Sequence, residues 1–209
     1  MHGSTRPVVF TPSNEPYLGL DQLLKFDKLI GATLELNAAT APRSHGQSLT
    51  DHQHMACLVI AQALSISLSI RELIRQGYLF GGHVLVRPFV ERAVMLIYLY
   101  LFPDDIDIWN HGWNHRDAPG LAKMLERIRS KHMPEESVPA SHLTTALNSL
   151  LHARPDSAKW NMISIRERPA HAVSKILDRP ELCDELCGNV IPWLTVVGIL
   201  MGTYFPEKG

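Results

Sequence analysis

Two long apolar segments that meet at a glycine constrain this chain more than any other feature. Residues 51–76 and 79–102 carry apolar side chains at intervals of three and four, with Gly77 between the two segments. This spacing predicts two helices, and the glycine stop predicts that they are antiparallel neighbours. Residues 55–70 are apolar on nearly every side, which predicts a central helix, and Thr50 is its expected N-cap.

Pro88 interrupts the second of these segments. A proline inside a helix lacks one amide and clashes with the preceding turn. The sequence therefore predicts a kink at residues 84–87 or a new helix that begins at Pro88.

The same periodicity predicts the rest of the fold. Further helices are expected at residues 20–39, 119–131, 137–151 and 180–205, with a polar linker at 42–48 and a short acidic and aromatic segment at 106–115. No β alternation is evident, and residues 156–178 show no regular pattern. The expected fold is therefore all-α: one antiparallel bundle of six or seven helices over residues 20–209, behind a loose, proline-containing arm at residues 1–19.

Composition indicates a cytoplasmic protein without a membrane span. Twenty Lys and Arg residues balance 21 Asp and Glu, so no global charge draws the chain to nucleic acid or to an anionic membrane. Three cysteines are typical of a reducing compartment, and the N-terminal residues do not resemble a signal peptide. Residues 79–102 are long enough to span a bilayer but contain His83, Arg87 and Glu91, so a buried soluble helix is expected.

These same three polar residues form the first candidate site. Their spacing of four places His83, Arg87 and Glu91 on one face of an apolar helix. A buried arginine needs a counter-charge or a polar ligand, so the stripe predicts either an ion pair that fixes helix register or an internal pocket for a small anionic or polar ligand. A stripe that faces solvent is the third alternative.

His152 is the second candidate, as a general acid or base. It follows the helix expected at 137–151, one turn after Asn148. It either interacts with the dipole at the helix end or, if that end packs near Arg87, moves protons there, because histidine titrates near neutrality.

No cofactor or metal site is expected. His111 and His115 have metal-ligand spacing, but two ligands are too few, and Cys183 and Cys187 lack a second cysteine pair. The chain also has no phosphate-binding glycine loop.

The segment Leu-Val-Arg87-Pro-Phe-Val-Glu91 resembles an uncharacterised family of bacterial helical-bundle proteins. That family is marked by Leu-Arg-x-x-x-Glu on an apolar helix and by a histidine after a later helix. Arg87, Glu91 and His152 match these positions, and residues 58–152 are covered. The resemblance implies a fold and no particular activity.

A more distant resemblance is to HEPN domains, helical bundles that often dimerise and in many cases cleave RNA. Their arginine and histidine lie four to six residues apart on one helix, and both Arg166 with His171 and Arg127 with His132 have this spacing. This resemblance implies a metal-independent ribonuclease acting through Arg166 and His171. Glu167 replaces the usual asparagine.

The leading hypothesis from the sequence is a homodimeric binding or interaction module with a pocket around Arg87 and Glu91. The last helix is apolar on most sides and predicts the dimer interface, through Trp193, Val196, Val197, Ile199 and Leu200. The alternative is the RNA-cleaving enzyme.

Overall fold

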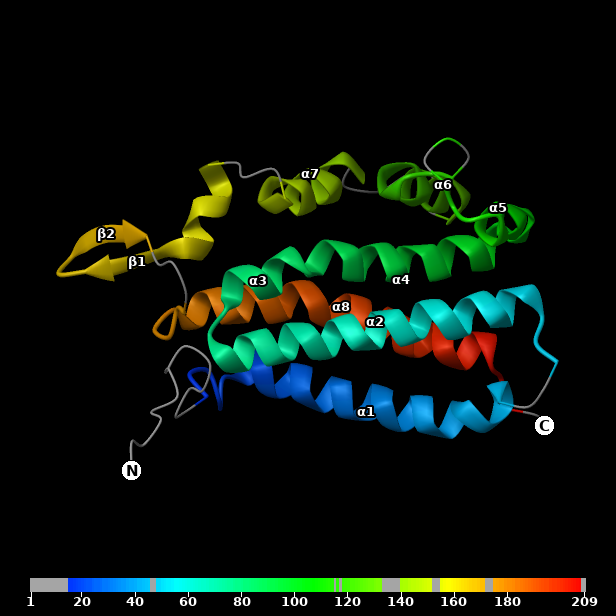
Figure 1. Ribbon diagram of the computed structural model, residues 1–209, viewed down its shortest axis with the longest axis horizontal. Helices are drawn as coiled ribbons and strands as arrows, with labels where there is room; N and C mark the ends of the chain where they lie inside the picture. The colour runs from blue at the N-terminus through cyan, green and yellow to red at the C-terminus, as the bar shows by residue number, and fades with distance from the viewer. Residues whose placement is uncertain are drawn as a thin grey trace, which may run out of the picture.

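The computed structural model describes residues 15–45, 48–114, 116, 118–132, 140–151, 155–171 and 175–207, which are mostly helical (Figure 1). In chain order the elements are α1 (Asp21–Ser44), α2 (Asp51–Gln76), α3 (Leu79–Val84), α4 (Val86–Leu101), η1 (Pro103–Asp105), α5 (Ile106–Asn110), α6 (Leu121–His132), α7 (Ala140–Leu151), η2 (Pro155–Asn161), β1 (Met162–Ile165), β2 (Arg168–His171) and α8 (Pro180–Tyr204). The expected all-α helical bundle is confirmed.

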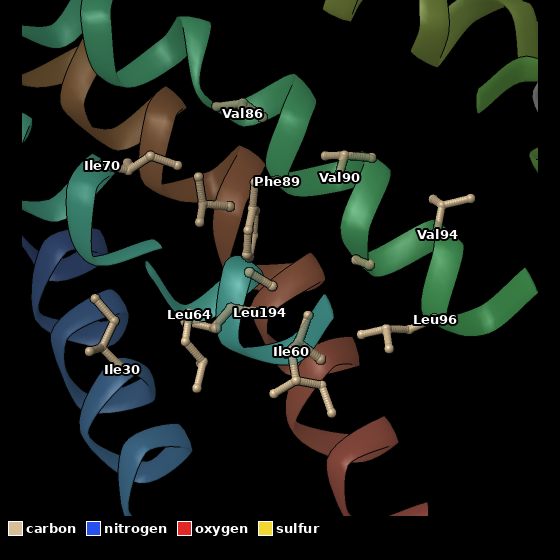
Figure 2. Packing of buried hydrophobic residues seen from close by; sticks show 14 of the residues in the cluster. Ile30, Ile60, Leu64, Ile70, Val86, Phe89, Val90, Val94, Leu96 and Leu194 are labelled. Carbon is tan, nitrogen blue, oxygen red and sulfur yellow. The ribbon is translucent and has the colours of Figure 1, made fainter. Parts of the chain in front are cut away.

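Four long helices, α1, α2, α4 and α8, enclose the core, while α5, α6 and α7 lie along the α4 side (Figure 1). Figure 2 shows apolar side chains from all four long helices converging, with Phe89 pointing from α4 toward α2 and α8. Phe89, Ile70 and Leu194 are fully buried, as the helical spacing of apolar residues requires.

The first and last helices run in the same direction. Near their starts, the Tyr17 hydroxyl donates to the Ile176 carbonyl at 2.5 Å, and at their ends Arg43 donates to the Phe205 carbonyl at 2.7 Å. The segment from α5 to the hairpin carries the chain back along the bundle before α8 begins (Figure 1). Helix α2 is therefore antiparallel to α1, α4 and α8.

Both ends of α2 were predicted correctly. The Thr50 hydroxyl accepts from the Gln53 amide, and the Gln53 side chain accepts from the Thr50 amide, so a complete capping box opens the helix. Gly77 ends it with a left-handed φ of 80° and has its amide bonded to Ile74. This sharp stop sets the turn into α3.

Helix α1 is longer than predicted, because it continues through Pro42 to Ser44 instead of ending at residue 39. Pro42 removes one amide from the hydrogen-bond ladder without ending the helix. The last turn gains other bonds: Nδ1 of His45 lies 2.6 Å from the Ala41 carbonyl, and Arg43 reaches the end of α8. The expected polar linker is correspondingly shorter.

The break at Pro88 was predicted correctly. Leu85 separates α3 from α4, with its amide bonded to the Gly81 and Gly82 carbonyls. Pro88 has no amide to give to the carbonyl of Val84, so the helix is interrupted one turn before the proline.

The expectation that residues 156–178 contain no strand was wrong. Strands β1 and β2 form an antiparallel hairpin in which Ile165 pairs with Arg168 and Ser164 pairs with Pro169. The two turn residues, Arg166 and Glu167, have φ values of 49° and 64°, which is a type I′ turn without the usual Asn-Gly. In an antiparallel hairpin, hydrogen-bonded residue pairs alternate with non-hydrogen-bonded pairs, and Pro169 belongs to a non-hydrogen-bonded pair. An amide at this position would point away from the partner strand, so the proline removes no hydrogen bond from the hairpin.

Residues 15–19, assigned to the loose arm by the sequence, pack against the bundle. Tyr17 is 2% exposed, and Glu15 accepts a hydrogen bond at 2.6 Å from Arg71 of α2. Arg71 also donates two hydrogen bonds to Asp27 of α1. A half-buried arginine thus fixes α1 and the preceding turn to α2; residues 1–14 lie outside the described part of the chain.

The apolar residues of α8 are divided between the core and the surface. Val197 and Leu200 are buried, Trp193 and Val196 are half-buried, and Ile199 is 64% exposed. Part of the apolar surface assigned to a dimer interface is therefore covered within the chain. The homodimer stays a prediction.

Two described helices, α2 and α8, are long and apolar enough to cross a membrane by length and composition alone. Core helices of soluble proteins pass the same test, and both helices contribute to the core here. The cytoplasmic location stays a prediction.

Gly77 and Gly31 should respond in opposite ways to alanine. A Cβ on Gly77 would lie 2.7 Å from a Leu177 methyl and 3.0 Å from the Ile176 oxygen, at a φ that disfavours side chains. We expect Gly77→Ala to cost about 2 kcal/mol of unfolding free energy or more. Gly31 is helical with open space around it, so Gly31→Ala should add up to about 1 kcal/mol. Urea denaturation of both variants measures this; a neutral Gly77→Ala would contradict the close packing.

Candidate functional site

Arg87 of α4 is held by two partners. Its Nε donates to Glu91 at 3.0 Å, and one terminal nitrogen donates to the side-chain oxygen of Asn148 on α7. The side chains of Arg87 and Glu91 are 26% and 32% exposed. The i,i+4 ion pair expected from the sequence is thus present, and it is open to solvent on one side instead of sealed in the core.

The open side of this ion pair faces a pocket of about 590 Å³. Arg92 of α4 and Gln62 of α2 add polar groups, and Trp109 and Trp113 supply aromatic walls. The remaining lining is aliphatic or small, from α2, α4, α6 and the loop that precedes α6: Val59, Met95, Ala118, Pro119, Gly120, Leu121 and Met124. This mixture is typical of a ligand pocket, where apolar walls carry a few directed polar groups.

The two indoles are fixed by neighbouring rings. Trp113 contacts the Tyr98 ring edge-on at a centroid distance of 6.4 Å, and Trp109 contacts the His54 ring in the same way at 6.5 Å. Trp113 has a φ of 47°, a left-handed conformation that is rare for a large side chain. Such outliers persist where the surroundings impose them and concentrate at functional sites.

Helix α6, which forms one wall of the pocket, is anchored by Arg127. This residue donates to Asp105 at 2.8 Å and also to the hydroxyl of Tyr98, which itself donates to Asp105. The guanidinium lies 4.5 Å from the centroid of the Phe102 ring. Burial raises the pKa of Tyr98, so its hydroxyl stays protonated. Arg127 therefore joins α6 to the end of α4.

The pocket has an excess positive charge. Two arginines, Arg87 and Arg92, line it together with one carboxylate, Glu91, among the described residues. Arg92 is oriented by the Pro88 carbonyl at 3.0 Å and by Gln62 at 3.3 Å. Guanidinium groups held in this way favour a bound carboxylate or phosphate.

His83 lies in a different pocket, so the predicted stripe of three residues is divided. The break at Leu85 separates α3 from α4, and His83 lines a second pocket of about 380 Å³ that neither Arg87 nor Glu91 lines. Its ring stacks on Trp160 with centroids 3.9 Å apart. The spacing-of-four argument assumed one continuous helix through this segment.

The imidazole of His83 is neutral at physiological pH. The side chain is buried, with 8% of the residue exposed, and its Nδ1 is enclosed with no hydrogen-bond partner among the described residues. Burial, assisted by the nearby Lys159 ammonium, lowers the pKa of His83 to about 4.

His152 lies outside the described residues. The condition for its proposed role was that its helix packs near Arg87, and Asn148 of α7 meets that condition by bonding to Arg87. A role for His152 in proton transfer stays a prediction.

Arg166 and His171 are not brought together on a helix. Arg166 is in the hairpin turn, and His171 is at the far end of β2, paired with Met162. His171 is three residue steps along the strand from the turn-adjacent Arg168, a distance of roughly 10 Å at about 3.3 Å per residue. Arg127 and His132 do lie on one helix, α6, where Arg127 forms an ion pair with Asp105. The pair assigned to RNA cleavage, Arg166 and His171, lacks the single helix that a HEPN ribonuclease requires.

No cluster of three or more His, Cys, Asp or Glu side chains placed to hold a metal ion occurs in the part of the chain that the structure describes. Cys183 and Cys187 are both fully buried in the core. Their mutual hydrogen bond and burial raise the pKa of the Cys187 thiol. His111 is exposed, and its expected partner His115 is outside the described residues.

The sequence argument missed most of the pocket around Arg87. Trp109, Trp113, Arg92 and Gln62 come from separate segments, and no linear spacing connects them. One signal was present: two tryptophans in a short polar segment are expensive to leave in solvent.

No protein-family model matches the chain, and comparison with curated proteins and with solved structures found no match.

Replacing His83 by phenylalanine should reduce the loss of unfolding free energy that occurs as the pH falls. The pKa of an unfolded histidine is about 6.5. Between pH 6.5 and pH 4, residue 83 is therefore protonated in the unfolded chain but neutral in the folded chain. Stability therefore falls as the pH falls through this window. We expect the parent protein to lose about 2 kcal/mol more than His83→Phe between pH 7 and pH 5.

The measurement is urea denaturation of both proteins at the two pH values. Phenylalanine preserves a ring that can stack on Trp160, and all other histidines are common to the two proteins. Equal losses would show that His83 is protonated as readily in the folded chain as in the unfolded one.

Proposed function

We propose that this protein is a small-molecule binding module, and that the pocket of Arg87, Glu91 and Arg92 takes a ligand with an anionic group attached to a planar ring. The observation that carries the proposal is the half-exposed guanidinium of Arg87, oriented by Glu91 and Asn148 at the edge of a pocket with two indole walls. A carboxylate or phosphate would bind the arginines, and the ring would pack against Trp109 and Trp113.

The state of Arg87 supports a binding role over a purely structural one. Glu91 and Asn148 engage two of its three guanidinium nitrogens, and the third has no partner among the described residues. An exposed i,i+4 pair contributes only about 0.3–0.5 kcal/mol to stability. Helix register is set by the buried core that surrounds Phe89, so this pair is not needed for it.

Tryptophan fluorescence offers a direct test, because the four tryptophans of the chain divide evenly between the two pockets. A reporter protein with Trp160→Phe and Trp193→Phe retains only Trp109 and Trp113. We expect benzoate to change its emission saturably. Adding Arg87→Met should weaken benzoate binding about tenfold or more, the loss of one charge-assisted contact of about 1.4 kcal/mol or more.

Arg75→Met in the same reporter is the matched control, because Arg75 also bonds to a glutamate on its own helix but lies on the exposed surface away from the pocket. It should leave benzoate affinity unchanged, and Arg87→Met should change the unfolding free energy by less than about 1 kcal/mol. Absence of a saturable benzoate response, or equal affinity in parent and Arg87→Met proteins, would refute the proposal.

A further inference from the structure

The second pocket is lined by five elements, α3, α4, α7, η2 and α8. His83 of α3 and Trp160 of η2 form an aromatic stack at one wall, and Trp193 of α8 is half-buried at another. Aliphatic side chains complete the lining: Val86 and Val90 from α4, and Leu143, Ala146 and Leu147 from α7. Its volume of about 380 Å³ is in the range of pockets that hold one- or two-ring molecules.

The charged groups of this pocket cancel. The Lys159 ammonium bonds to both carboxylate oxygens of Glu185, at 2.6 and 2.8 Å, and both side chains are near half exposed. The lowered pKa of His83 keeps the imidazole neutral. The described lining thus has no excess charge, in contrast to the pocket of the two arginines, and desolvating a charged ligand here would not be compensated.

Two polar groups in this region lack partners. Nδ1 of His83 is enclosed without a hydrogen bond, and the exposed side-chain amide of Asn189 has no partner in the described part of the chain. The amide carries both donors and an acceptor, so it can bond to a hydroxyl or an N–H group. A ligand without a polar group could not form a hydrogen bond with this amide.

We infer that the His83 pocket is a second binding site, independent of the Arg87 pocket, and that it takes a compact neutral aromatic molecule with one hydroxyl or N–H group. The ring packs among Trp160, Trp193 and the aliphatic wall, where aromatic contacts add to the burial of apolar surface. The polar group bonds to Asn189. The Lys159–Glu185 pair stays intact at the pocket.

The test uses a reporter with Trp109→Phe and Trp113→Phe, which retains only the tryptophans of this pocket, and p-cresol as the probe. We expect a saturable change in emission with p-cresol, at least fivefold weaker binding of toluene, and no binding of benzoate at this site. No saturable response to p-cresol, or benzoate binding as tightly as p-cresol, would overturn the inference.

Two variants of α7 check that the probe occupies the pocket. Ala146 lines it, so Ala146→Phe should fill the space and abolish the response, whereas the neighbouring Thr145 does not line it. Thr145→Phe should therefore bind p-cresol like the reporter itself. Thermal melts confirm that both variants fold. An unchanged response in a folded Ala146→Phe protein would place the probe elsewhere and overturn the inference.

The role of the amide is tested by Asn189→Leu. Loss of its hydrogen bond should remove the preference for p-cresol over toluene while toluene affinity stays the same. A preference that survives would overturn the assignment of Asn189 as the polar contact. Because benzoate and Arg87 report only on the other pocket, either proposal can fail without the other.

Discussion

The missing amide of Pro88 determines how the polar residues of this bundle are distributed. One absent hydrogen bond interrupts the helix at Leu85, and the residues on either side then belong to different pockets. His83 lines the pocket that contains Trp160 and Trp193. Arg87 and Glu91 line the pocket that contains Trp109 and Trp113. A continuous helix would align all three on one face.

Helix α7 lies between the two pockets. Its Asn148 orients Arg87, while Leu143, Ala146 and Leu147 line the other pocket, so one helix positions the arginine of the first pocket and forms a wall of the second. Helix α6 also has two roles: it lines the arginine pocket, and Arg127 attaches it to the end of α4.

Sequence reasoning succeeded where structure is local. The cap at Thr50, the stop at Gly77, the break before Pro88 and the start of α8 at Pro180 each depend on residues within one turn, and each was predicted. It failed where geometry depends on tertiary packing. The type I′ turn at Arg166 and Glu167 has none of the glycine or asparagine that signals such a turn, and the arginine pocket is assembled from segments that only the fold brings together.

The parallel pairing of α1 with α8 has a consequence for how the chain folds. The hydrogen bonds that join these helices connect residues roughly 160 positions apart, so α1 cannot pack against α8 until the whole intervening chain has been made. Joining such distant segments requires closing a very long loop, which is entropically slow. The apolar face of α1 is therefore incompletely covered until α8 packs against it.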